Sequence, residues 1–267
     1  MRPRPLALLA AAALVAACSS FPSIPAPWDP AEPSTSEPPT SAGVTPISWQ
    51  RIGSSVRGKP IQACTIGDGP RRVYIIGGIH GDEPEAPAAA ELLPGLLSPP
   101  PPGLTIRLVR DMNPDGSTAR LRTNTRRIDL ERNWPAKDFH SDERSGARPL
   151  SEVETAAVHA DIAAFKPDII VVFQSANLPP TVAVFGPSLL PANEFARAAR
   201  AVSPNWRFNP QRTTPTPGSP ESLFGRDQGK TVLRVEFQRG RPADLNARAA
   251  AAGLATLAPS PTAQPAR

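Results

Sequence analysis

Short apolar runs alternate with amphipathic stretches from residue 47 to residue 257. The runs at 73–79 and 168–173 are rich in Val and Ile, which is typical of strands buried on both faces. Such runs, separated by helical stretches, predict an α/β domain with a mixed, largely parallel central sheet and helices on both faces. Further strands are expected at 47–56, 60–66, 104–110, 182–185 and 231–237, and helices at 85–97, 151–166, 192–202 and 243–257.

Two of these helices carry local signals for where they break or begin. Pro94 removes a backbone donor, so we expect it to break the helix at 85–97. Ser151 is followed three residues later by Glu154, the signature of a capping box, and is expected to start the next helix. His159 lies off the Val/Ala stripe of that helix and is therefore expected to face solvent.

The first 17 residues have the layout of a secretory signal peptide, a basic start followed by an apolar run. That run, about ten residues, is shorter than the roughly 20 that span a bilayer. Residues 15–18 resemble a bacterial lipobox, so Cys18 is expected to carry lipid; the alternative is an ordinary signal peptide with an incidental cysteine. Ser19 then indicates the periplasmic side of the outer membrane, with the lipid anchor as the membrane contact.

Proline and charge bound the rest of the chain. The 36 prolines gather near both ends and in one internal loop, so we expect a disordered tether at 18–46, a Pro-rich tail at 258–267 and one folded domain at 47–257. The second cysteine, Cys64, is expected to be a small core residue. The net charge of +5 comes from scattered basic residues, so we expect no nucleic-acid partner, and we expect a monomer.

Candidate chemistry begins directly after the apolar run at 73–79. There a Gly-flanked turn carries His80 and Glu83, three residues apart. Imidazole nitrogen and carboxylate oxygen are both zinc donors, and ligands in such sheets bind beyond the carboxyl ends of strands. On its own, the pair is weak evidence, and a surface histidine followed by a helix-starting glutamate would be the better interpretation.

Further motifs follow in a fixed order along the chain. They are Asn-Pro-Asp-Gly at 113–116, Arg-Thr-Asn at 122–124, Asp-Leu-Glu-Arg-Asn-Trp at 129–134 and Val-Glu-Phe at 235–237. Together with the turn at 77–84, this order resembles the zinc metallocarboxypeptidase family, and within it the branch of bacterial murein-tripeptide amidases (γ-D-glutamyl-diaminopimelate carboxypeptidases). The resemblance covers most of the expected domain and implies its metallocarboxypeptidase-like fold.

The resemblance also implies a role for each matching residue. His80 and Glu83 match two zinc ligands, and Arg122 matches the arginine that stabilises the oxyanion. Arg132 matches the arginine that binds the substrate carboxylate, and Glu236 matches the glutamate that moves the proton. Asn113 is placed among the substrate-binding residues on the same basis. The implied substrate is a peptide or muropeptide.

Two positions depart from the family pattern. Gln174 stands where the third zinc ligand, a histidine, is expected, and a neutral amide is a poorer zinc donor than imidazole. The sequence thus predicts a Zn²⁺ site that is weak or absent. Glu131 stands in place of the asparagine before Arg132; its charge is expected to weaken capture of a carboxylate and to suit an ammonium group instead.

Three functions remain open on these observations. The first is a zinc-dependent carboxypeptidase or amidase that cuts cell-wall peptides with Gln174 as a tolerated ligand. The second is a degenerate lipoprotein that binds a muropeptide without cutting it. The third is a deacylase of N-acyl amino acids, which shares some of these motifs.

Overall fold

The computed structural model describes residues 48–209 and 214–259. The expected signal peptide, Cys18, the tether and nearly all of the tail lie outside these residues, and their predictions stay predictions. None of the helices in the described part is both long and apolar enough to cross a membrane.

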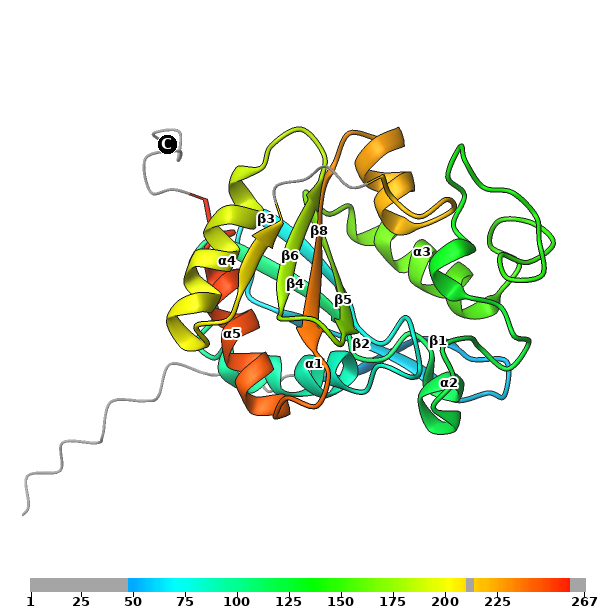
Figure 1. Cartoon of the computed structure of the whole chain (residues 1–267), viewed down its shortest axis with the longest axis horizontal. Helices are drawn as coiled ribbons and strands as arrows, with labels where there is room; N and C mark the ends of the chain where they lie inside the picture. The colour runs from blue at the N-terminus through cyan, green and yellow to red at the C-terminus, as the bar shows by residue number, and fades with distance from the viewer. Residues whose placement is uncertain (1–47, 210–213, 260–267) are drawn as a thin grey trace, which may run out of the picture. The chain divides into compact units, whose positions relative to one another are not determined.

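A single mixed sheet of eight strands organises the described residues (Figure 1). Its four central strands, β4, β3, β5 and β8, run parallel, while β2 and β6 flank them antiparallel. The predicted fold class is confirmed. In spatial order the strands are β1 (Gln50–Ser54), β2 (Pro60–Ile66), β4 (Leu104–Val109), β3 (Arg71–Ile76), β5 (Ile169–Ala176), β8 (Thr231–Gln238), β6 (Thr181–Phe185) and β7 (Arg207–Asn209).

Helices cover both faces of this sheet (Figure 1). One face packs against α1 (Glu85–Leu96), α4 (Leu190–Val202) and α5 (Ala243–Ala255). The other packs against α3 (Val153–Phe165) and the π-helical segment η2 (Glu221–Asp227). Two short helices, α2 (Pro114–Ala119) and η1 (Leu130–Arg132), lie in the long polar segment between β4 and α3.

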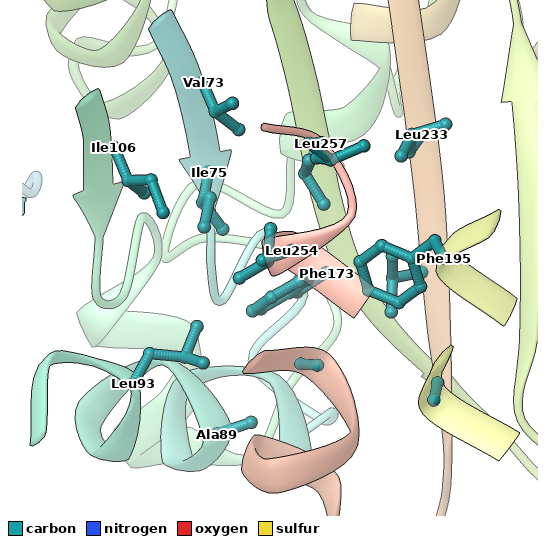
Figure 2. Close-up of a cluster of buried hydrophobic side chains, with 14 of the residues drawn as sticks. Val73, Ile75, Ala89, Leu93, Ile106, Phe173, Phe195, Leu233, Leu254 and Leu257 are labelled. Atoms are coloured by element: carbon teal, nitrogen blue, oxygen red, sulfur yellow. The ribbon is translucent and has the colours of Figure 1, made fainter. Parts of the chain in front are cut away.

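The larger core lies under α1, α4 and α5 (Figure 2). Alternation along β5 sends Phe173 into this core and Val172 into the opposite one, as expected for a strand covered on both faces. Phe173 packs edge-on against Phe237 of β8, with ring centroids 5.1 Å apart. Cys64 is buried in the same cluster, as predicted, and burial raises the pKa of its thiol to about 12.

Two predictions made from local sequence signals, the helix break at Pro94 and the capping box at Ser151, are wrong. The helix α1 runs through Pro94 and ends two residues later, at Leu96. The capping box at Ser151 does not form, because Glu154 instead accepts hydrogen bonds from the backbone of Val56 and from Asn124. The buried face of α3 therefore includes polar Glu154, and His159 packs against Phe224 rather than facing open solvent.

The packing of α4 against α5 provides a stability test. A Cβ added at Gly253 in α5 would stand 2.5 Å from the ring of fully buried Phe195, whereas one added at Gly95 in α1 meets nothing within 4 Å. Alanine favours a helix over glycine by about 0.5–1 kcal/mol, and overpacking a core costs about 1–3 kcal/mol.

We therefore expect Gly253→Ala to lower the free energy of unfolding and Gly95→Ala to raise it slightly. Urea denaturation of the two variants beside the parent protein measures both changes. Equal stabilisation by both substitutions would show that α4 and α5 are not packed as described.

Candidate active site

The predicted chemistry gathers at the carboxyl ends of the parallel strands. After β3 the chain turns at Gly78, whose φ of +64° is a conformation that glycine adopts readily. A Cβ there would come within 2.4 Å of the Asp111 carboxylate, so the turn also needs the missing side chain. This turn delivers His80 and Glu83 to the same edge of the sheet that carries Gln174 on β5 and Glu236 on β8.

His80 is buried and held on both ring nitrogens. Its Nδ1 lies 3.0 Å from Glu83 Oε1, and its Nε2 lies 3.2 Å from Asp129 Oδ1 and 3.3 Å from Glu131 Oε2. Burial alone lowers the pKa of an imidazole, but the hydrogen bonds to Asp129, Glu131 and Glu83 outweigh it and hold the pKa of His80 well above 6.5. The three carboxylates around the ring therefore favour its protonated form.

Gln174 and Glu236 are neighbours across the sheet. They are partners in the parallel register of β5 and β8, so their side chains leave the same face. The next residue along β5, Ser175, donates its backbone N–H to Glu83 Oε2 at 2.6 Å, which places Glu83 beside this end of the strand. Glu236 accepts a hydrogen bond from Thr181 on β6, at 3.0 Å. Gln174 was expected after the strand, but β5 extends through it.

Arg122 contacts a cluster of three buried carboxylates, those of Glu83, Asp129 and Glu131. Its Nε and Nη2 donate to Asp129 Oδ2 and Glu131 Oε2, both at 3.0 Å, and its Nη1 lies 3.7 Å from Glu83 Oε1. Arg132 approaches the same carboxylate cluster, with its Nε 3.5 Å from Asp129 Oδ2. Burial alone raises the pKa of Asp129, but hydrogen bonds from His80 and the charges of His80 and Arg122 hold it well below the usual value.

Glu131 occupies a different environment from the one its place in the sequence suggests. It is buried and makes no contact with Arg132 in the described part of the chain; its carboxylate faces His80, Arg122 and, at 3.7 Å, Arg234. Burial alone raises its pKa, but the bond to His80 and the charge of Arg234 lower it to about 2. Three cations thus lie beside the Glu131 carboxylate, whose charge was expected to weaken the capture of a substrate carboxylate by Arg132.

Asn113 has no free group to offer a substrate. It is fully buried, its Oδ1 caps α2 by accepting the Gly116 N–H at 3.0 Å, and its Nδ2 donates to the backbone of Ile79 and Arg122. In the structure this side chain ties the loop of Arg122 to the turn of His80, and substrate binding by Asn113 stays a prediction.

Sequence reasoning missed two charged residues on and after β8. Arg234 lies two residues before Glu236, on the same face, and its Nε donates to Glu221 Oε1 at 2.8 Å. This partner, Glu221, is fully buried in η2. Arg239 follows β8 and lies 3.2 Å from Asp82 Oδ2 and 3.8 Å from Glu83 Oε1. The period of two along β8 could have revealed Arg234; nothing local points to Arg239.

The residues fit a divalent cation at the predicted place. His80 Nδ1 and Glu83 Oε1 are 3.0 Å apart, a separation that two donors at roughly 2.0–2.2 Å from one ion can have. The side-chain nitrogen of Gln174 is buried with no hydrogen-bond partner in the described residues, so its amide is not committed elsewhere. The donor atoms of His80, Asp129 and Glu131 also lie within 4.8 Å of one another, but Arg122 already neutralises both carboxylates.

Comparison with solved structures identifies the class of fold. The chain superposes on the murein-tripeptide amidase MpaA from Escherichia coli O157 with a TM-score of 0.63 and 22% identity, covering 80% of this chain and 93% of that one. Bovine thrombin-activatable fibrinolysis inhibitor gives a TM-score of 0.64, 17% identity and coverages of 79% and 88%. A metallo-carboxypeptidase from Burkholderia cenocepacia gives a TM-score of 0.61 and 22% identity, covering 79% of this chain and 63% of that one.

This chain therefore has the fold of the metallocarboxypeptidases, as the sequence resemblance implied, and its neighbours include a murein-tripeptide amidase. No protein-family model and no curated protein sequence matches the chain.

The charge on His80 provides a direct test of this geometry. In protein treated with a chelator, we expect the His80 ring to stay protonated as the pH rises through 6.5, while burial lowers the pKa of His159 below that value. Because the pKa of His80 is raised, its stabilising charge is fully present below about pH 6.5 and is lost as the pH rises through the folded-state pKa.

Proton NMR titration of the three histidines measures this, with His80→Gln and His159→Gln assigning the signals. A His80 ring that loses its proton below pH 6.5 would contradict the contacts described.

Proposed function

We propose that this protein is a metal-dependent amide hydrolase that acts on cell-wall peptides. The observation that supports this most is the pairing of Gln174 with Glu236 across β5 and β8, beside the contact between His80 and Glu83. Together they bring a potential proton carrier to the edge of a potential cation site, on a fold whose neighbours are carboxypeptidases and amidases.

Each residue has a chemical task in this proposal. A divalent cation, held by His80, Glu83 and the amide oxygen of Gln174, would polarise the scissile carbonyl and acidify a water. Glu236 accepts the proton of the attacking water and delivers it to the leaving amine. Arg122, fixed by the carboxylates beneath it, stabilises the negative charge that develops on the carbonyl oxygen.

Arg132 is suited to hold the substrate's terminal carboxylate. Its two terminal nitrogens have no partner among the described residues, and a guanidinium with two free N–H groups matches a carboxylate in bidentate geometry. The substrate that we propose is a γ-D-glutamyl-diaminopimelate peptide. The expected lipid anchor at Cys18 belongs to the same proposal, because it would hold a monomeric enzyme on the periplasmic side of the outer membrane.

A second candidate function is binding of a muropeptide without cleavage. The observation that favours it is the combination of an amide at position 174 with an Arg122 whose Nε and Nη2 are already bonded to Asp129 and Glu131. A neutral third donor weakens cation affinity, and a guanidinium engaged in this way has fewer donors left for an oxyanion.

Metal content and turnover of three proteins decide between the two. We expect the parent protein to bind zinc weakly and to cut the γ-D-glutamyl-diaminopimelate bond slowly. Gln174→His is expected to raise zinc affinity by at least about 10-fold, because imidazole is a better zinc donor than a neutral amide and even outer-shell partners of a ligand change metal affinity by about 10–100-fold. Glu236→Gln is expected to keep the zinc and to lose roughly 10²–10⁴-fold in rate.

Elemental analysis and chromatographic detection of the released amino acid provide the readouts. Absence of both zinc and turnover in the parent protein would overturn the hydrolase and leave the binding function. Turnover in the parent protein would exclude the second candidate outright.

A further inference from the structure

The charged groups of the candidate active site are arranged in two layers. The carboxylates of Glu83, Asp129 and Glu131 form the lower layer, with side chains no more than 5% exposed. The guanidiniums form the upper one, with side-chain exposures of 39% for Arg122, 28% for Arg132, 17% for Arg234 and 34% for Arg239. A ligand approaching from solvent therefore meets arginines first.

Arg122 is the hub of this upper layer. It shares Asp129 Oδ2 with Arg132 and Glu83 Oε1 with Arg239, and both it and Arg234 face Glu131. The buried carboxylates thus draw the arginines together from different segments of the chain. Guanidiniums held this close cost free energy unless counter-charges compensate them, and the exposed side of the layer is open to such charges.

Arg132 and Arg239 keep the most unused donors. Within the described residues, Arg132 has only a 3.5 Å approach of Nε to Asp129, and that Nε is buried without a hydrogen-bond partner. Arg239 uses Nη2 alone, towards half-exposed Asp82 and towards Glu83, and its Nε and Nη1 make no bond there. Its backbone N–H donates to Ala176 O at 2.9 Å, which anchors it at the end of β5.

These two arginines approach carboxylates that are bonded to different nitrogens of the His80 ring. Arg132 approaches Asp129, which is bonded to His80 Nε2, whereas Arg239 approaches Glu83, which is bonded to Nδ1. A substrate whose scissile amide sits beside His80 and Glu83 therefore has one guanidinium near the Nδ1 carboxylate and another near the Nε2 carboxylate.

We propose that Arg239 is a second carboxylate-binding residue, so that the substrate carries one carboxylate on each side of the scissile amide. This inference rests on the proposed function, because it locates the scissile bond at His80 and Glu83. A γ-linked glutamyl peptide has this chemistry: the free α-carboxylate of the glutamyl residue lies on the acyl side, and the released amino acid supplies the other. In an ordinary α-linked peptide the α-carboxyl group on the acyl side forms the amide itself, so this free α-carboxylate is missing.

Two matched peptides test the proposal by binding alone. One is γ-D-glutamyl-diaminopimelate, and the other is the same compound with the glutamyl α-carboxylate converted to a carboxamide. Calorimetric titration is carried out on the full chain bearing Glu236→Gln, so that slow cleavage cannot deplete the ligand. We expect the carboxylate form to bind about 10-fold more tightly, or about 1.4 kcal/mol.

Adding Arg239→Gln is expected to abolish this preference for the carboxylate form. Adding Arg239→Lys is expected to keep part of it, because lysine retains the positive charge but not the bidentate guanidinium geometry. Arg197→Gln, which removes an exposed arginine of α4 paired with Glu194, is the matched control and is expected to change nothing. Circular dichroism confirms that each variant is folded.

Three results would overturn the inference: equal affinity for both peptides, a preference that survives Arg239→Gln, or no binding of either peptide. None of them depends on turnover, which the protein with intact Glu236 reports separately. A failure of this inference is therefore distinguishable from a failure of the proposed hydrolysis.

Discussion

The candidate active site depends on the hydrogen bonds and ion pairs of one carboxylate, that of Asp129. This one buried carboxylate accepts His80 Nε2, Arg122 Nε and the backbone N–H of Glu131, and it lies 3.5 Å from Arg132 Nε. Removing one partner from such a buried network leaves the other charges uncompensated, at a cost of about 3–5 kcal/mol. The positions of His80, Arg122 and Arg132 are thus tied to one side chain in the long polar segment.

This network explains how the site tolerates an added acid beside an arginine. The Glu131 carboxylate lies beside His80, Arg122 and Arg234, so its charge is compensated inside the network. The consequence is a site whose negative charges are internal and whose open donors are guanidiniums. This layering is the basis of our proposal that the site binds carboxylates, whether the peptide is cut or only held.

The sequence predicts the parts of this structure that local patterns encode. Buried Val and Ile runs gave the central strands, and motif order placed His80, Glu83 and Glu236 at one sheet edge. Tertiary contacts decided the rest. Glu221 pairs with Arg234 on a different element, and Arg239 reaches the site only through Asp82 and Glu83.

The central claim is that His80, Glu83 and Gln174 meet at one cation, with Glu236 across from them. A crystal of the zinc-soaked protein, measured on both sides of the zinc absorption edge, tests it most directly. The account predicts one anomalous peak on the Nδ1 side of His80, bonded to Glu83 and the Gln174 amide. No peak, or a peak on the Nε2 side between Asp129 and Glu131, would contradict it.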